Sequence, residues 1–369
     1  MNPSWKIRKN PPAILVESDC CGPFFTKKEY EKIIFDMNIT VLGTGAWGTA
    51  LAYALSKDPN NRILMYGKDP VEVTDIVEHH QNSRYFDDVT LPLSISATLD
   101  AAEALKGASV LLLAVPSSQI NNIVDLIVEH CDTTPLIINV IKGFDPVTGE
   151  GIAFLIEKRL NEKNKNGGVV SLVGPSFAHD VIHDDLTAIC AVSENKEAAK
   201  FVQKLFSSAS FRVYVQTDVV GAEIGAGMKN IIAIASGIME GLGYHDNTRS
   251  ALITRGLAEI TRFGLAKGAK APTFLGLTGV GDLTLTCSSH RSRNYTLGLD
   301  IGKEDEAAPV LARNTKTVEG VLAAKTIHFE AKKAGIETPI TDAVYEVLYE
   351  NKKPSEAVLE LMTRELKEE

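Results

Sequence analysis

Short, continuous apolar runs alternate with helical stretches through the first half of the chain. The runs cover residues 38–42, 62–66, 110–115, 136–141 and 169–173, and an alanine-rich stretch over 47–56 is typical of a helix. Strands that are apolar at every position are buried on both faces, as in a parallel sheet covered by helices. The alternation therefore predicts a doubly wound α/β domain of the Rossmann type.

The pattern changes near residue 221. Residues 221–241 are rich in Ala, Gly and Ile with almost no charge, and 250–268, 317–335 and 339–362 have helical periodicity. We expect the Rossmann domain over residues 37–221, an all-α domain over residues 222–369, and an N-terminal extension over residues 1–36. The extension has mixed charges and too short an apolar patch for a secretory signal, so the sequence assigns it no function.

Composition and charge narrow the functional class. The chain is 44% hydrophobic and 23% charged, which is typical of a globular protein. Its net charge of −9 argues against nucleic-acid binding, and no apolar run approaches the roughly 20 residues of a membrane span. Five cysteines without a CxxC pair favour a reducing cytoplasm. His179 and His183 lie four residues apart without an acidic or cysteine partner motif, so we expect no metal site.

Residues 43–48 form a GxGxxG pattern between a predicted strand and a predicted helix. In that context Gly43 permits a tight turn, Gly45 lets the backbone approach a pyrophosphate, and Gly48 lets the helix pack closely on the strand. The amides at the start of the helix would then face the anion. This loop predicts that the chain binds NAD or NADP.

The end of the second strand leaves the choice of cofactor open. Lys68 and Asp69 follow that strand. A lysine suits the 2′-phosphate of NADP, an aspartate suits a ribose hydroxyl of NAD, and a solvated turn would account for both residues. The lysine slightly favours NADP, or the use of both cofactors.

Polar turns follow three predicted strands, at the edge where an open α/β sheet binds its ligands. These turns begin at Val115, Lys142 and Gly174. Proline and glycine in such turns often have only the structural role of ending a strand. Lysine is rarely buried without a partner, however, so Lys142 at the end of a buried strand is a candidate functional residue.

Lys229 lies within the apolar helix that begins near residue 221. Ala222, Ala226 and Ala233 share its helical face, so this lysine projects from a surface of small residues. A lysine that snorkels at a domain boundary is the ordinary explanation. The functional explanation is a general acid–base, whose usual pKa of about 10.4 is lowered by burial and by a neighbouring cation such as Lys142.

Residues 279–294 hold Asp282, two arginines, several serines and Asn294 in a stretch that opens with glycines. Arginine can grip phosphate through two parallel hydrogen bonds. The stretch therefore suits a phosphorylated ligand, and a solvated polar loop is the alternative.

Taken in order, these motifs resemble the bacterial-type NAD(P)-dependent sn-glycerol-3-phosphate dehydrogenase family. The likeness rests on GxGxWG, VPS, KG, GPSFA, GAGMKN, LITRGLAE, GxGDLxxTC, SRN and VEG, and runs from about Met37 to about Glu360. Asp180, Leu186 and Glu240 depart from the family pattern, in conservative or peripheral positions. The resemblance implies interconversion of sn-glycerol 3-phosphate and dihydroxyacetone phosphate, which supplies glycerophospholipid synthesis. It also implies a cytoplasmic enzyme, and a homodimer would be consistent with the family.

The resemblance also implies which residues form the site. Lys229 matches the proton acceptor. The positions that match substrate contacts are Lys142, Gly174, Ser176, Asp282, Ser292, Arg293 and Asn294. Beyond the three loop glycines, the positions that match cofactor contacts are Ala46, Trp47, Lys68, Tyr85, Lys142, Ala178, Arg293, Thr317 and Glu319.

The hypothesis is that neutral Lys229 takes the C2 hydroxyl proton while a hydride leaves C2 for the nicotinamide. Asp282 would orient Lys229 or the hydroxyl, Arg293 and Asn294 would anchor the phosphate, and Lys142 would add positive charge. Two other functions stay open: a β-hydroxyacid dehydrogenase that acts on a carboxylate, and a non-catalytic redox sensor that binds NAD(H) and a protein partner. The stretch Ser292-Arg293-Asn294 favours phosphate over carboxylate.

Overall fold

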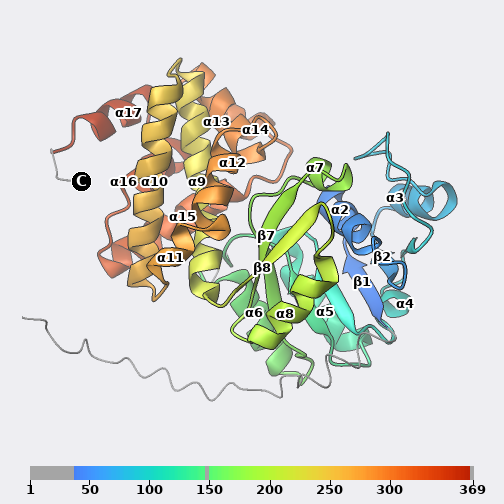
Figure 1. Cartoon of the computed structure of the whole chain (residues 1–369). Helices are drawn as coiled ribbons and strands as arrows, with labels where there is room; N and C mark the ends of the chain where they lie inside the picture. Colours follow the sequence, from blue (N-terminus) through green and yellow to red (C-terminus); the bar gives the residue numbers. More distant parts are fainter. Residues whose placement is uncertain (1–36, 146–148, 366–369) are drawn as a thin grey trace, which may run out of the picture.

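The computed structural model describes residues 37–145 and 149–365, so the predicted extension over residues 1–36 and the last residues of the predicted helical domain lie outside the described residues. Within them, an eight-stranded sheet with helices on both faces is followed by a helical domain (Figure 1). The predicted fold class, a Rossmann-type domain joined to an all-α domain, is confirmed.

The sheet has the strand order β3-β2-β1-β4-β5-β6-β7-β8. Its strands are β1 (Asn38–Leu42), β2 (Arg62–Tyr66), β3 (Ile95–Thr98), β4 (Val110–Leu113), β5 (Leu136–Asn139), β6 (Val169–Val173), β7 (Thr187–Val192) and β8 (Phe211–Gln216). The first six are parallel, while β7 is antiparallel to β6 and β8 is parallel to β7. The order reverses between β1 and β4, and ligands of doubly wound sheets bind beside such a reversal.

Helices cover both faces of the sheet, which explains why its central strands are buried on both faces and nearly continuous in apolar residues. The helical elements of this domain are α2 (Ala46–Leu55), α3 (Pro70–Thr74), the π-helical turn η1 (Asp75–His79), α4 (Ala101–Leu105), the 3₁₀ turn η2 (Ser117–Gln119), α5 (Ile120–His130), α6 (Ile152–Asn161), α7 (Ala178–Ile182) and α8 (Lys196–Phe206). Alternate residues of β1 point to opposite faces: Val41 packs in the cluster with α2 and α8, and Leu42 packs in the cluster with α4, α5 and α6.

The helical domain is built around one long helix, α9, which lies beside α10 in Figure 1. Its elements are α9 (Val219–Gly241), α10 (Asp246–Ala266), α11 (Ala271–Phe274), the π-helical turn η3 (Leu277–Gly281), α12 (Asp282–Cys287), α13 (Arg293–Glu304), α14 (Ala308–Arg313), α15 (Glu319–Ala334), α16 (Pro339–Tyr349) and α17 (Pro354–Met362). The start of α9 also packs on the sheet, where Ala222 and Ala226 contact Val173 and Val192. Helix α9 therefore joins the two domains.

Glycines let α9 and α13 pack at close range. A Cβ atom on Gly237 would lie 2.0 Å from the carbonyl oxygen of Tyr295, and a Cβ atom on Gly298 would lie 2.1 Å from the carbonyl oxygen of Ile234. These reciprocal contacts leave no room for a larger residue on either helix. They hold the start of α13, with Arg293 and Asn294, in a fixed position relative to α9.

Two expectations from the sequence were wrong in detail. Helix α9 is, by length and composition, apolar enough to cross a membrane, although no such run was expected; 83% of its most apolar window is buried, and the helix forms the core of its domain. The helix expected over 339–362 is two helices, because the chain breaks at Asn351, which has a left-handed backbone, and α17 begins at Pro354.

Candidate active site

The glycine loop lies at the reversal of strand order and has the geometry that a dinucleotide needs. Gly43 has a φ of 122°, and a Cβ atom there would lie 2.5 Å from the carbonyl oxygen of Ala114. A Cβ atom on Gly48 would lie 2.3 Å from the carbonyl oxygen of Gly43. Gly45 differs, because a Cβ atom on it would have no described protein atom within 4 Å. The open space at Gly45, next to the start of α2, fits a pyrophosphate.

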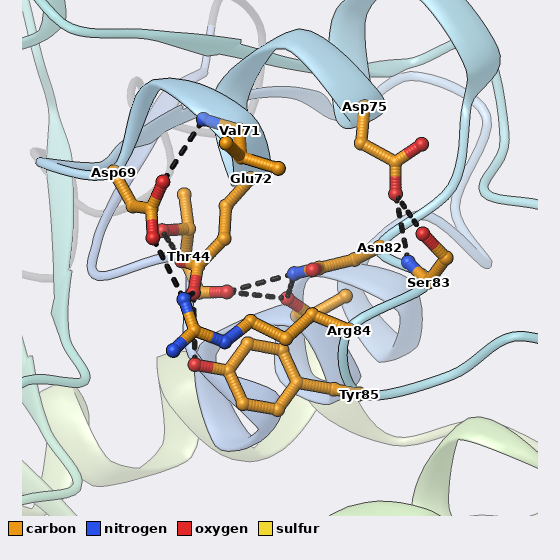
Figure 2. Close-up of polar contacts among 10 residues, drawn as sticks. Thr44, Asp69, Val71, Glu72, Asp75, Asn82, Ser83, Arg84 and Tyr85 are labelled. Atoms are coloured by element: carbon orange, nitrogen blue, oxygen red, sulfur yellow. Dashed lines mark hydrogen bonds and ion pairs between the residues drawn. The ribbon is translucent and has the colours of Figure 1, made fainter.

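The remaining candidate cofactor residues of the sheet domain lie around this loop. Ala46 and Trp47 open α2 and pack against the core, as does Ala178 at the start of α7. Lys68 is exposed just after β2. The hydroxyl of Tyr85 donates to Glu72 over 2.9 Å, in a cluster with Thr44 of the loop (Figure 2).

Lys142 and Gly174 follow two adjacent strands, β5 and β6. The side chain of Asn139 ties the strand ends together by donating to the hydroxyl of Ser171 over 3.1 Å. Gly174 has a φ of 153°, and a Cβ atom there would lie 2.9 Å from the Cα atom of Ile189. Ser176 donates to the carbonyl of Gly174 over 3.1 Å. The conformation of the turn after β6 is therefore fixed by the glycine at position 174 and by the hydrogen bond within the turn.

Lys229 lies at the centre of a buried charged cluster that both domains supply. Its Nζ atom donates to the Oδ1 atom of Asp282 over 2.5 Å and to the hydroxyl of Thr286 over 3.0 Å. The Nζ atom of Lys142, from the sheet domain, lies 3.6 Å from the other carboxylate oxygen of Asp282. Lys229 and Asp282 are 4% and 1% exposed. One carboxylate thus lies between two lysines.

The two lysines differ in electrostatic environment. Desolvation lowers the pKa of Lys229 to about 8; Asp282 opposes that shift and Lys142 adds to it. Desolvation also acts on Lys142, but the charges of Asp282 and Glu319 outweigh it and raise the pKa of Lys142. Near neutral pH, Lys142 is the permanent cation and Lys229 is the lysine that can exchange a proton.

A line of amide contacts runs from Lys229 toward α15. Its neighbour Asn230 accepts a hydrogen bond from the side chain of Asn294 over 3.0 Å. The side-chain oxygen of Asn294 in turn accepts from the backbone of Gly320 over 2.8 Å. Glu319 opens α15 and lies 3.5 Å from the Asn230 amide, while Thr317 is exposed just before it. The structure therefore brings Asn294 and Glu319 to the Lys229 cluster.

The start of α13 presents the candidate anion site. The hydroxyl of Ser292 caps this 12-residue helix by accepting from the backbone of Tyr295 over 3.3 Å. Arg293, its first residue, is exposed. Arg291 pairs with Asp180 of α7 in the other domain instead. Of the two arginines that suggested a phosphate site, Arg293 is therefore the one at the helix start.

Sequence reasoning missed several residues of the site. Thr286 lies four residues after Asp282, so both are on one face of α12, and that spacing could have identified it. Asn230 directly follows Lys229 in the motif. Glu72 is buried beside the glycine loop, and nothing in its local sequence distinguishes it from other helical acids.

A dinucleotide loop on a Rossmann-type sheet, together with a buried lysine cluster supplied largely by a helical domain, defines a two-domain class of nicotinamide-dependent dehydrogenases. Comparison with known proteins identifies the family within that class. The model of the N-terminus of NAD-dependent glycerol-3-phosphate dehydrogenase matches residues 38–199, and that of its C-terminus matches residues 218–359. The chain belongs to the NAD-dependent glycerol-3-phosphate dehydrogenase family.

Individual relatives agree with that assignment. Glycerol-3-phosphate dehydrogenase [NAD(P)+] of Listeria monocytogenes serotype 4b is 42% identical over 329 residues, 89% of this chain and 97% of the relative. The protein of the same name from Staphylococcus haemolyticus is 41% identical over 331 residues, 90% of this chain and 99% of the relative. The crystal structure of glycerol-3-phosphate dehydrogenase from Coxiella burnetii has a TM-score of 0.81 and 32% identity, and covers 89% of this chain and all of that one.

Proposed function

We propose that this chain interconverts sn-glycerol 3-phosphate and dihydroxyacetone phosphate, with NAD or NADP as the hydride carrier. The observation that carries the proposal is the buried contact of Lys229 with Asp282, beside Lys142, in a chain of this family. Residues 37–221 would bind the dinucleotide, and residues from 222 onward would supply the proton-transfer group.

The cofactor would lie along the glycine loop, where Gly43 and Gly48 shape the turn and Gly45 leaves space for the pyrophosphate. Ala46, Trp47, Lys68, Tyr85 and Ala178 would contact it from the sheet domain, and Arg293, Thr317 and Glu319 from the helical domain, with Lys142 at the junction. When bound, the nicotinamide ring accepts or returns the hydride of C2.

Neutral Lys229 would remove the proton of the C2 hydroxyl as the alcohol is oxidised to the ketone. The proton passes to Nζ, which becomes an ammonium, and the electron pair of the C2–H bond leaves with the hydride. Asp282 stabilises the resulting ammonium over 2.5 Å and fixes its direction. In the reverse direction the protonated Lys229 returns its proton to the oxygen of the ketone.

Positive charge and amide groups would hold the phosphorylated substrate. Arg293 and Asn294, at the capped start of α13, would bind the phosphate, because a helix start and a guanidinium both favour anions. Ser292 would keep that start in shape. Lys142 would balance the charge at the reacting carbon, and Gly174 and Ser176 would border the substrate from the sheet domain.

The family and the cysteine content suit a cytoplasmic enzyme that supplies glycerophospholipid synthesis. Cys131, Cys190 and Cys287 are free and buried. A homodimer is the assembly that we infer from family likeness, and light scattering coupled to size-exclusion chromatography measures it directly.

The decisive experiment is an absorbance assay of dihydroxyacetone phosphate reduction with NADH and NADPH in parallel, beside a panel of small β-hydroxyacids. We expect turnover of the triose phosphate alone. Turnover of the hydroxyacids instead would establish a β-hydroxyacid dehydrogenase. Tight cofactor binding with no turnover of any substrate would favour a redox sensor, whose function would need neither Lys229 nor Arg293.

A further inference from the structure

A second polar cluster lies beside the glycine loop, at the end of β2 (Figure 2). Its centre is Glu72 on α3, which is 7% exposed. One carboxylate oxygen of Glu72 accepts from the hydroxyl of Thr44, between Gly43 and Gly45, over 2.6 Å. The other accepts from Tyr85 over 2.9 Å and from Arg84 over 3.0 Å. The cluster thus fixes Arg84 relative to the pyrophosphate loop.

Both acids that could accept from a ribose hydroxyl in this place are already engaged. Asp69 caps α3 by accepting from the backbone of Val71 over 2.9 Å, and its second oxygen accepts from Arg84 over 2.7 Å. Both oxygens of Glu72 also accept hydrogen bonds. An NAD-selective site presents an acid to the ribose hydroxyl, whereas here Asp69 and Glu72 both hold the guanidinium of Arg84, and an arginine in this place suits a 2′-phosphate.

The guanidinium of Arg84 has further hydrogen-bond donors that its contacts with Asp69 and Glu72 do not use. Its contacts with Asp69 and Glu72 both use Nη1, and among the described residues no other contact of its guanidinium with a carboxylate occurs. The side chain is 59% exposed. Its remaining edge, Nε and Nη2, has the geometry for two parallel hydrogen bonds to a phosphate. The exposed Lys68 adds a second cation at the same strand end.

We propose that Arg84 binds the 2′-phosphate of NADP and makes this chain select NADP(H) over NAD(H). Asp69 and Glu72 act as positioning residues, because they hold the guanidinium at the ribose end of the site. Lys68 contributes charge without a fixed direction. The proposal rests on the dinucleotide site proposed above and not on the identity of the substrate.

Calorimetric titration of the purified full chain tests this without turnover. The probes are 2′,5′-ADP, which carries the 2′-phosphate, and 5′-ADP, which lacks it; NADPH and NADH form a second pair. We expect the wild type to bind 2′,5′-ADP at least about tenfold more tightly than 5′-ADP, as suits hydrogen bonds to a charged group. Arg84→Gln should reduce that ratio to about twofold or less and leave the affinity for 5′-ADP unchanged.

Matched variants keep the test decisive. Arg313 is likewise exposed and paired with an acid, Glu304, but lies in the helical domain, so Arg313→Gln should leave the ratio unchanged. Arg84→Lys, which keeps the charge, should retain part of the preference and serves if Arg84→Gln unfolds. Equal binding of the two probes by the wild type, or loss of the preference in Lys68→Gln but not in Arg84→Gln, would overturn the proposal. Failure of the proposed substrate would instead appear as absent turnover with the nucleotide preference intact.

Discussion

At the scale of single residues, the proposed reaction depends on Lys229, whose side chain is buried. Lys229→Ala should lower turnover by about 10²–10⁴-fold, the usual contribution of a positioned acid–base. Thr286 and Lys142 remain as polar neighbours of Asp282 when the Lys229 side chain is removed, so circular dichroism and thermal unfolding should show a folded protein. Lys332→Ala, at an exposed lysine of α15, is the control and should retain full activity. Near-native turnover of Lys229→Ala would remove Lys229 from the proposed role.

The pH dependence of the reaction should report the pKa of Lys229. Oxidation needs the neutral amine, so its kcat/KM should rise as pH increases through about 8, and reduction, which needs the ammonium, should fall over the same range.

The two neighbours of Lys229 should move that midpoint in opposite directions. Asp282 raises the pKa of Lys229 and Lys142 lowers it. Asp282→Asn should therefore shift the midpoint to lower pH, and Lys142→Gln should shift it to higher pH. Rate against pH in the two variants checks this even where the absolute rate is reduced. Midpoints that do not move would show that another group titrates.

At the scale of elements, the turn between β1 and α2 and the start of α2 hold two glycines for which we expect different roles, Gly45 in cofactor binding and Gly48 in packing. Gly45→Ala should fold normally and weaken NADPH binding by about tenfold, because its methyl group would enter only the space of the ligand. Gly48→Ala should instead lower the free energy of unfolding by more than about 2 kcal/mol, since its methyl group would overlap the carbonyl of Gly43. Chemical denaturation and cofactor titration of both variants check the contrast. Equal effects of the two substitutions on stability would contradict it.

The strands that the sequence predicted share a local signal that the missed edge strands lack, while β7 was missed although it is nearly continuous in apolar residues. The five predicted strands are central and nearly continuous in apolar residues, whereas β3 and β8 are edge strands in which buried and exposed positions alternate. The antiparallel direction of β7 depends on pairing with β6, which no local pattern encodes. Pro354 indicates the break before α17, but the helical periodicity of the residues on both sides predicts one continuous helix.

The same distinction holds for the site. The glycine loop, Lys142 and Lys229 were predictable because a glycine spacing or a lysine in an apolar segment stands out locally. The contact of Lys229 with Asp282 joins residues 53 positions apart, and that of Thr44 with Glu72 joins residues 28 apart. Such contacts arise from packing between elements, so Glu72 and Arg84 became visible only in the folded chain.

At the scale of the whole molecule, α9 carries a partly exposed acid, Glu223, that links the domains. Glu223, six residues before Lys229 on the same helix, accepts a hydrogen bond over 2.6 Å from the backbone of Ala153 at the start of α6. Its carboxylate lies directly against Gly151. Glu223 thus ties the helix that bears Lys229 to the element that follows the Lys142 turn. Desolvation raises the pKa of Glu223 to about 7.

This raised pKa predicts how stability depends on pH. Between its usual pKa of 4.5 and about 7, Glu223 is protonated in the folded chain and ionised in the unfolded one, so its contribution to stability falls as pH rises through that range.

Glu223→Gln mimics the protonated side chain and keeps an acceptor for Ala153. The variant should match the wild type below pH 4.5 and exceed its free energy of unfolding by about 1–2 kcal/mol at pH 8, allowing for the partial exposure of the side chain. Urea denaturation across that range measures the difference. Glu356→Gln, at an exposed acid of α17, keeps Glu223, so its difference from the wild type should be the same at every pH. A constant difference between wild type and Glu223→Gln at every pH would mean that the carboxylate is solvated in the folded chain and does not strain the domain junction.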